Sequence, residues 1–334
     1  MPPFDAVLVI AFGGPLGPED VRPFLANVLR GRRVAPERVE EVAHHYELFG
    51  GISPLTALTR AQAAGIGDRL KARGCSLPVY VGMRNWHPFL SETLAEMSRA
   101  GVRSAAGLIM AAHRSYSSCT QYRENVRDAQ SALRQAGLPH LDVIYGEDWY
   151  LHDGFIRASV DHVQTAIDAL PPAQRVRAKL IFTAHSIPAT MAARYPYERQ
   201  YHATADAIAA AAREATGLSL PSATVYQSRS GRPEDPWLGP DICDYLREEH
   251  ARGTDTVVLC PAGFVCDHIE VLYDLDTEAA SVCRELGMTM VRAASVNDHP
   301  AFLETMAEVV WRTVQRYERG RPLPVVAGAA GAAA

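Results

Sequence analysis

Four acidic residues close together in the sequence are the first candidates for chemistry. Asp267, Glu270, Asp274 and Glu278 lie three, four and four residues apart. On an α-helix this spacing places the carboxylates in one row along one face. Like charges in such a row repel one another, so the row destabilises the helix unless a cation or solvent relieves the repulsion.

The residues around these acids favour a chemical role. A solvated acidic face, with Asp267 near the positive end of a helix dipole, is the ordinary explanation for such a pattern. Apolar residues nevertheless crowd the segment 271–275. Carboxylates that are partly buried among them would have raised pKa values or would hold a hard or borderline cation.

A histidine supplies the second candidate group. His185 ends the apolar stretch "AKLIFTAH", and Ser186 and Pro188 follow it. A single histidine is commonly structural, but the carboxyl end of a strand in an α/β fold is where ligands bind. Imidazole also titrates near neutral pH, which suits proton transfer. We interpret His185 and Glu270 together as a site for metal binding and proton transfer.

Two other chemistries are disfavoured by their spacing. The segment "QSRSG" lacks the first glycine of the GxSxG turn that a Ser-His-Asp hydrolase needs. The segment "AFGGPLGPED" is glycine-rich but lacks the GxGxxG spacing of a dinucleotide site. We interpret it as a tight strand-to-helix turn whose backbone amides can still face an anionic group.

Aromatic and arginine residues gather in the expected loops. A large flat ligand that carries carboxylates would need aromatic walls and arginine clamps. Each such residue alone is more readily explained as surface or core. The candidates in these loops are Arg30, Arg32, Tyr116, Tyr122 and Trp237.

Short apolar strands must position these groups, and longer helical patterns alternate with them. The strands lack strict alternation of polar and apolar residues, as expected when both faces of a sheet are covered. The expected strands are 6–12, 78–82, 104–112, 141–146, 178–185, 223–228, 256–262 and 288–293. The expected helices are 54–74, 88–100, 120–136, 153–169, 198–216, 239–252 and 298–318.

This alternation predicts an α/β fold with two doubly wound, Rossmann-like domains, each built on a parallel sheet of about four strands. We place the first domain at 4–148 and the second at 149–292. The segment 293–318 is expected to pack back on the first domain as a helix. Residues 319–334 are expected to form a flexible tail.

Composition limits the partners. The chain has 334 residues, a net charge of −5 and 48% hydrophobic residues. A nucleic-acid binder usually carries a basic excess, so that class is disfavoured. Six cysteines without a CxxC pair indicate reduced thiols rather than a disulfide framework. Neither a signal peptide nor an apolar run of transmembrane length is evident, so we expect a cytoplasmic protein.

Several motifs together resemble the ferrochelatases, which insert ferrous iron into a porphyrin in haem biosynthesis. The resemblance covers roughly residues 5 to 318 in the order of the family. It is carried by "FGGP", "NVLRGRR", "EVAHHYELFGGISPL", "GMRNWHP", "SYSSCTQYREN", "FTAHSIP", "DPWLGPDI" and "GFVCDHIEVLYDLD". The residues of the N-terminal motifs are most similar to those of the soluble, actinobacterial-type members.

The resemblance implies a chelatase-like fold of two Rossmann-like domains with a porphyrin cleft between them. His185 and Glu270 match the histidine and glutamate at the family's metal-insertion site. Asp274 and Glu278 match an acidic path for metal or protons. Tyr116 and the segment that holds Arg30 and Arg32 match residues that line the cleft. Whether His185 is the base or a metal ligand stays open, and we favour the base, assisted by Glu270.

Departures from the family refine the expectation. Phe12 stands where some soluble members carry a tyrosine that can reach the iron, so we expect it to contact porphyrin without ligating the metal. No cysteine follows Cys283, so we expect no [2Fe–2S] cluster and no permanently bound cofactor. The substrates implied are Fe²⁺ and a porphyrin, with coproporphyrin III favoured over protoporphyrin IX.

We expect the protein to be a monomer. The resemblance leaves two alternative functions open. The alternative functions are a non-catalytic carrier of haem or metal and a related chelatase that inserts Co²⁺ or Ni²⁺ into another tetrapyrrole.

Overall fold

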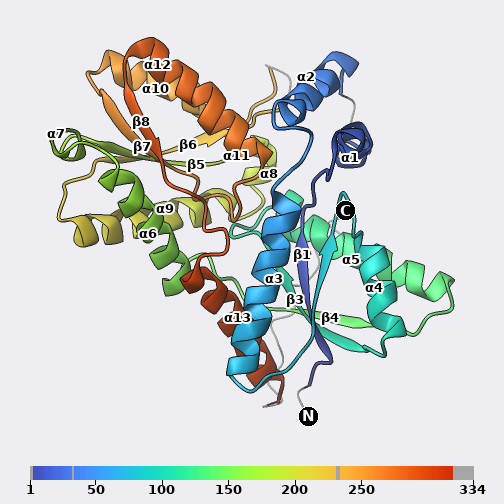
Figure 1. Cartoon of the computed structure of the whole chain (residues 1–334). Helices are drawn as coiled ribbons and strands as arrows, with labels where there is room; N and C mark the ends of the chain where they lie inside the picture. The colour runs from blue at the N-terminus through green and yellow to red at the C-terminus, as the bar shows by residue number, and fades with distance from the viewer. Residues whose placement is uncertain (1–2, 32–33, 231–233, 319–334) are drawn as a thin grey trace, which may run out of the picture.

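A computed structural model describes residues 3–31, 34–230 and 234–318 of the chain. In this part of the chain the strands form two separate parallel sheets of four strands each (Figure 1). The first sheet has the order β2-β1-β3-β4, with β1 at Ala6–Ala11, β2 at Val79–Met83, β3 at Ser104–Ile109 and β4 at Asp142–Tyr145. The second has the order β6-β5-β7-β8, with β5 at Lys179–His185, β6 at Ser222–Gln227, β7 at Thr256–Cys260 and β8 at Thr289–Arg292.

The two sheets share one topology, because in each the second strand along the chain lies outside the first and the third and fourth follow on the other side. All eight predicted strands and the α/β fold class are confirmed. Every residue of β1 and of β7 is buried. Strands covered on both faces read as continuous apolar runs, which is why they could be recognised in the sequence.

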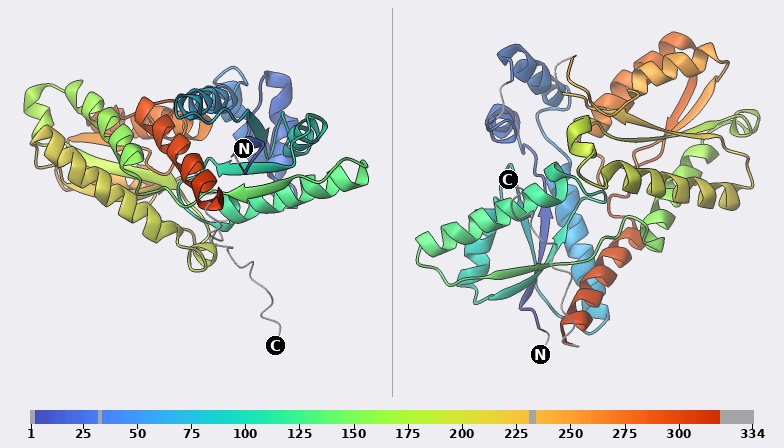
Figure 2. Two further views of the ribbon diagram at one scale, coloured as in Figure 1. Left: turned by 90° about the horizontal axis from the view of Figure 1, so that it is seen from below. Right: turned by 180° about the vertical axis from the view of Figure 1, so that it is seen from behind.

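Helices cover both faces of each sheet (Figures 1 and 2). In the first half they are α1 (Val21–Val28), α2 (Pro36–Glu47), α3 (Leu55–Ala72), α4 (Leu90–Arg99) and α5 (Gln121–Gln135). In the second half they are α6 (Asp153–Asp168), α7 (Pro172–Arg175), α8 (Ala189–Ala192), α9 (Tyr197–Thr216), α10 (Ile242–Ala251), α11 (Ile269–Tyr273) and α12 (Ala280–Leu286). The last helix, α13 (Pro300–Glu318), returns to the first half. A 3₁₀ turn lies at Pro18–Asp20, and π-helical turns lie at Tyr116–Thr120 and Asp274–Ala279.

All seven predicted helices are present, but α1, α2 and the short helices α7 and α8 were not predicted. Helices α1 and α2 follow the turn after β1. Proline at the first position of α2 is a helix-start signal that could have indicated this helix.

Helix α13 lies beside α3 on the first half (Figures 1 and 2). Its Phe302 and Met306 share one apolar cluster with Val7 and Val9 of β1. The same cluster includes Phe155, which lies near the start of α6. The predicted division of the chain near residue 148 stays a prediction.

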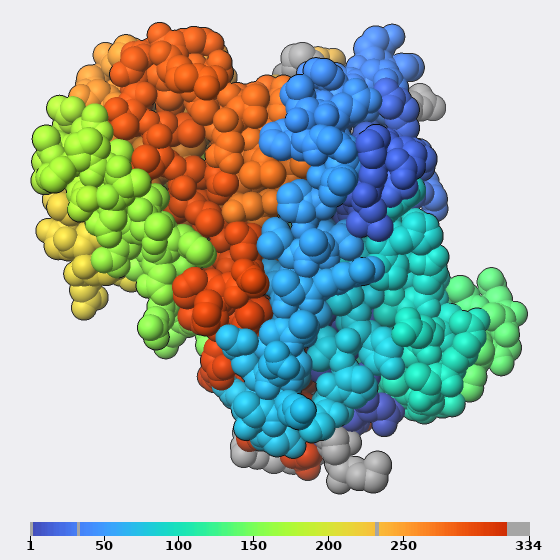
Figure 3. Space-filling view, viewed as in Figure 1, coloured from blue at the N-terminus to red at the C-terminus, as the bar shows by residue number. Residues whose placement is uncertain are grey.

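The two halves meet along a continuous seam. Figure 3 shows the segment of α2 and α3, in blue, against the orange segment that follows β7. Ile269 of α11 belongs to the same apolar cluster as Phe24 of α1 and Tyr46 of α2. This contact brings the acidic segment of the second half against helices of the first half.

Candidate active site

His185 is the last residue of β5, where its side chain is partly exposed. Its Nδ1 atom contacts the carbonyl oxygen of Ser186. A carbonyl oxygen can only accept, so in the neutral ring Nδ1 carries the hydrogen and Nε2 presents a free lone pair. The hydroxyl of Tyr197 donates to the His185 carbonyl oxygen at 2.9 Å, which fixes the backbone beneath the ring. His185 is therefore oriented to accept a proton or to bind a metal through Nε2.

The Glu270 carboxylate faces this lone pair. Its Oε2 atom lies 4.0 Å from Nε2 of His185. Bonds from borderline cations to nitrogen or oxygen ligands are about 2.0–2.2 Å long. The separation thus allows one ion to contact both side chains. The structure brings together the two residues that the sequence analysis placed at the centre of the site.

A second imidazole, which the sequence analysis did not include, approaches the same carboxylate. Nε2 of His268 lies 3.9 Å from Oε2 of Glu270. Nδ1 of His268 accepts a hydrogen bond from the Val271 amide at 3.4 Å and so caps α11. Burial lowers the pKa of His268, although the charge of Glu270 opposes this shift. His268 is therefore neutral at pH 7, with its Nε2 hydrogen on the side of Glu270. Its place directly before a helix was the only available signal.

Gln227 connects the histidine strand to the acidic helix. It pairs in register with His185 across β5 and β6 and is fully buried. Its Nε2 atom donates to the Glu270 carbonyl oxygen at 3.1 Å and to Oδ2 of Asp274 at 3.2 Å. One amide thus sets the distance between the end of β5 and the start of the acidic row.

Asp267 does not belong to the predicted row. It precedes α11, and its carboxylate accepts hydrogen bonds from Arg292 at 2.9 Å, from the Ser295 amide at 3.0 Å and from Asn297 Nδ2 at 2.9 Å. Burial alone would raise the pKa of Asp267, but Arg292 and these donors lower it overall. The expectation of four carboxylates in file was wrong at this position because the helix begins two residues later.

The other acids follow a widened helical turn. After α11 ends at Tyr273, Asp274–Ala279 forms a π-helical turn, and α12 begins at Ala280. Asp274 is 9% exposed, and it accepts hydrogen bonds from Gln227 and from the Ser228 hydroxyl. Burial, reinforced by the charges of Glu270 and Glu278, raises the pKa of Asp274 to about 7. A carboxyl with this pKa can both take up and release a proton near neutral pH.

Glu278 lies at the solvent end of the row. Partial burial of its carboxyl and the charge of Asp241 raise its pKa. Glu270, Asp274 and Glu278 therefore influence one another electrostatically and lead from the imidazoles toward the surface. In the described residues no group of three or more His, Cys, Asp or Glu side chains is arranged to hold a metal ion.

The pKa of Asp274 predicts a pH-dependent effect of Asp274→Asn. Between pH 4 and 7 the unfolded chain ionises at this position while the folded chain keeps its proton, so the folded state loses stability as pH rises. Each unit of pKa difference corresponds to about 1.4 kcal/mol. We expect the variant to gain stability over the wild type at pH 8 but not at pH 4, as measured by urea unfolding. An equal difference at both pH values would contradict a raised pKa.

Three of the predicted porphyrin-lining residues lie at the ends of the first sheet. The Arg84 guanidinium lies 5.7 Å from the Phe12 ring centroid and 5.9 Å from that of Tyr122. Tyr122 is buried, and burial raises the pKa of its phenol. Tyr116 is exposed, its hydroxyl donates to Glu124 at 3.0 Å, and its ring lies 6.5 Å from that of Tyr195 in the second half.

The remaining predicted lining residues are dispersed. Arg30 is exposed and donates to Oδ1 of Asn27 at 2.6 Å. Arg32 lies outside the described residues. Trp237 borders a cavity of about 330 Å³, together with Ser186 and Asp241. This cavity adjoins the residue that follows His185, so Trp237 lies on the site side of the second sheet.

The unpredicted helix α2 contributes two aromatic groups. Its Tyr46 is buried against Phe24, with ring centroids 5.6 Å apart, and burial together with the charges of Glu270 and Asp274 raises the pKa of its phenol. Its His45 stacks on Tyr273 of α11 at 3.5 Å between ring centroids. Helix α2 therefore packs against the acidic row from the opposite half.

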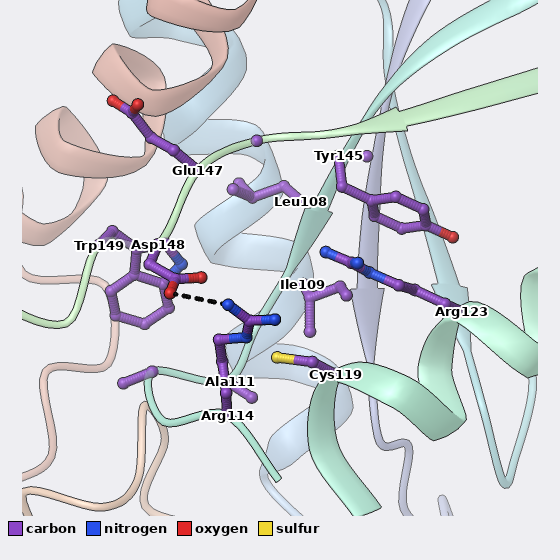
Figure 4. A pocket seen from close by; sticks show the side chains of 13 residues that line it. Leu108, Ile109, Ala111, Arg114, Cys119, Arg123, Tyr145, Glu147, Asp148 and Trp149 are labelled. Atoms are coloured by element: carbon purple, nitrogen blue, oxygen red, sulfur yellow. Dashed lines mark hydrogen bonds and ion pairs between the residues drawn. The ribbon is translucent and has the colours of Figure 1, made fainter. Parts of the chain in front are cut away.

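A second, much smaller cavity of about 30 Å³ lies at the ends of β3 and β4 (Figure 4). An ion pair between Arg114 and Asp148, 3.4 Å apart, crosses it. The Arg123 guanidinium lies 4.7 Å from the Tyr145 ring centroid beside it. At this size the cavity can hold water but not a porphyrin.

Two topologically identical sheets, with a histidine from a strand end facing carboxylates from a helix, define a chelatase-type α/β protein. The solved structure of SirB from Bacillus subtilis with Fe³⁺ shares this fold, with a TM-score of 0.55, 10% identity and coverage of 94% of this chain and 97% of that one. The family profile of ferrochelatase matches residues 4–314. The chain belongs to the ferrochelatase family.

Relatives of known name cover nearly the same length. A protein of Streptomyces coelicolor named coproporphyrin III ferrochelatase is 44% identical, over 99% of this chain and 91% of its own. A protein of the same name from Nocardia farcinica is 45% identical, over 92% and 87%. A Rhodopirellula baltica protein named ferrochelatase is 42% identical, over 93% and 86%. No helix in the described ranges is long and apolar enough to cross a membrane.

Proposed function

We propose that this protein inserts Fe²⁺ into coproporphyrin III in haem biosynthesis and releases two protons. The observation that carries this function is the position of the His185 imidazole, whose Nε2 atom lies 4.0 Å from Oε2 of Glu270. This pair supplies a proton acceptor and an oxygen ligand at the end of β5. Fe²⁺ and the porphyrin are substrates, and the protein needs no resident cofactor for this reaction.

The chemistry requires a base and a route for protons. A free porphyrin holds two pyrrole N–H protons, and both must leave as the metal enters. His185 accepts a proton at Nε2, and Glu270 stabilises the resulting imidazolium. Asp274, whose pKa is about 7, then exchanges protons with Glu270 and Glu278 toward the solvent. Contacts to the remote parts of the ring supply the bending that exposes its nitrogen lone pairs.

Turnover on two porphyrins tests the substrate. Coproporphyrin III carries four carboxylates, and hydrogen bonds to charged groups contribute about 1.5–3 kcal/mol each. We expect kcat/KM for ferrous insertion to be at least about tenfold higher with coproporphyrin III than with protoporphyrin IX, since 1.4 kcal/mol corresponds to tenfold. Equal or reversed values would contradict the substrate assignment.

Zinc insertion followed by absorbance separates an enzyme from a carrier. The enzyme converts the four-band spectrum of free porphyrin into that of the metalloporphyrin over many turnovers. A protein that binds porphyrin without changing its spectrum would be a carrier. The expected cytoplasmic location, the monomeric state and the absence of a [2Fe–2S] cluster stay predictions.

A further inference from the structure

Gln62 of α3 is completely buried at the point where three distant segments of the chain meet. Its Nε2 atom donates to the carbonyl oxygen of Val265 at 3.1 Å and to that of Asn297 at 2.7 Å. The same nitrogen lies 3.3 Å from Sγ of Cys266. Carbonyl oxygens can only accept, so the amide nitrogen must face them. Gln62 thus joins the first half to the loop that carries His268 and Glu270.

Asn297 continues this contact to the other side of the loop. Its Oδ1 atom accepts from the Asp267 amide at 2.9 Å, and its Nδ2 atom donates to Oδ2 of Asp267 at 2.9 Å. Asn297 has a φ of 43°, a left-handed conformation that asparagine tolerates better than most residues. Arg292, which pairs with Asp267 and Asp276, completes the clamp.

The loop 265–268, held by these contacts, leads directly into the segment that carries Glu270. The amides of Val265 to Asp267 lie within five residues of Glu270, and the start of α11 is set by the His268 cap. A shift of the loop would move the carboxylate that now lies 4.0 Å from His185. Among the described residues of α3, only Gln62 has a side chain that donates hydrogen bonds to the carbonyl oxygens of both Val265 and Asn297.

We propose that Gln62 is a positioning residue for metal insertion, which holds the loop 265–268 so that Glu270 faces His185. This inference rests on the proposed function. Gln62 contacts neither His185 nor Glu270, so its effect passes through the backbone of the loop. Without the amide, two carbonyl oxygens would lose their common donor inside the protein, and the loop would move to find others.

The test uses Gln62→Met, which keeps the length of the side chain and removes its donor. We expect kcat for metal insertion to fall by about 10- to 100-fold, because small misplacements of reacting groups reduce rates by such factors. Porphyrin affinity, measured by fluorescence, should stay unchanged. Amide hydrogen exchange should become faster in 265–271 but not in β1 or β5. Gln130→Met is the matched control, since Gln130 on α5 donates to the Leu141 carbonyl oxygen at 2.9 Å away from the site.

A second variant guards against a folding defect. Asn297→Gly removes both side-chain bonds to Asp267, while glycine accepts the left-handed backbone. It should reproduce the loss of kcat and the faster local exchange. Wild-type kcat in both folded variants, or activity that only follows the folded fraction with exchange raised across the whole chain, would overturn the proposal. If the wild type itself inserted no metal, the proposed function would fail. Faster hydrogen exchange in 265–271 of Gln62→Met would still show that Gln62 holds the loop.

Discussion

His185→Ala is expected to lose metal insertion while the protein still folds and binds porphyrin. General acid–base groups contribute about 10²- to 10⁴-fold to a rate, and Nε2 of His185 is also the nitrogen that faces the Glu270 carboxylate. We therefore expect kcat to fall by about a thousandfold. The side chain is partly exposed at a strand end and belongs to none of the apolar clusters, so its loss should not unfold the protein.

The measurement is zinc or ferrous insertion under saturating porphyrin, with binding followed separately by fluorescence. His140→Ala is the control, because His140 is an exposed histidine that pairs with Asp142 at the opposite end of the first sheet. Full turnover in His185→Ala would remove this residue from the mechanism. Loss of porphyrin binding together with turnover would instead assign His185 to substrate binding.

Glu270→Gln is expected to have the second largest effect. The substitution keeps the shape of the side chain but removes the charge that lies 4.0 Å from His185 and 3.9 Å from His268. Without that charge the protonated imidazole of His185 loses its partner and the metal loses an anionic ligand. We expect kcat/KM for the metal to fall by about 100-fold, with a higher KM for the metal and an unchanged KM for porphyrin.

A metal titration at fixed porphyrin concentration checks this expectation. Glu285→Gln on α12 is a suitable control, because Glu285 is an exposed carboxylate of the same helical region that pairs with Ser281. An unchanged KM for the metal would argue against Glu270 as a metal-facing group. A wild-type kcat would remove its role in proton transfer as well.

The strands could be predicted because buried parallel strands leave continuous apolar runs. His185 ends such a run and was chosen because ligands gather at strand ends, and the structure places it 4.0 Å from Glu270. Helices α1 and α2 escaped prediction, so the burial of Tyr46 and the stacking of His45 on Tyr273 could not be anticipated. Trp237 lies in a loop and Tyr116 begins a π-helical turn, and in both places side-chain direction depends on tertiary contacts.

The acidic segment shows where spacing alone fails. The three- and four-residue intervals assume one continuous α-helix from Asp267 onward. The His268 cap starts the helix later, and the Arg292 pair removes Asp267 from the row. Gln62 and Gln227 hold the site through contacts between residues far apart in the sequence, so no local pattern could reveal them. His268 contacts only near neighbours, and its place before a helix was its one local signal.

The π-helical turn at Asp274–Ala279 makes the number of residues in this segment part of the site. A π-helical turn contains more residues than an α-helical turn. Beyond it, α12 is held in the core by the buried Val282 and Cys283. If the same residues closed into ordinary α-helix, everything upstream would rotate about the helix axis relative to α12, by about the 100° that one α-helical residue contributes. Glu270 would then point away from His185 although no functional side chain had been altered. Removing one residue within 275–279 would offset this rotation, because the π turn holds about one residue more than an α-helical turn. The residue count and the backbone form of this turn together decide which way Glu270 faces.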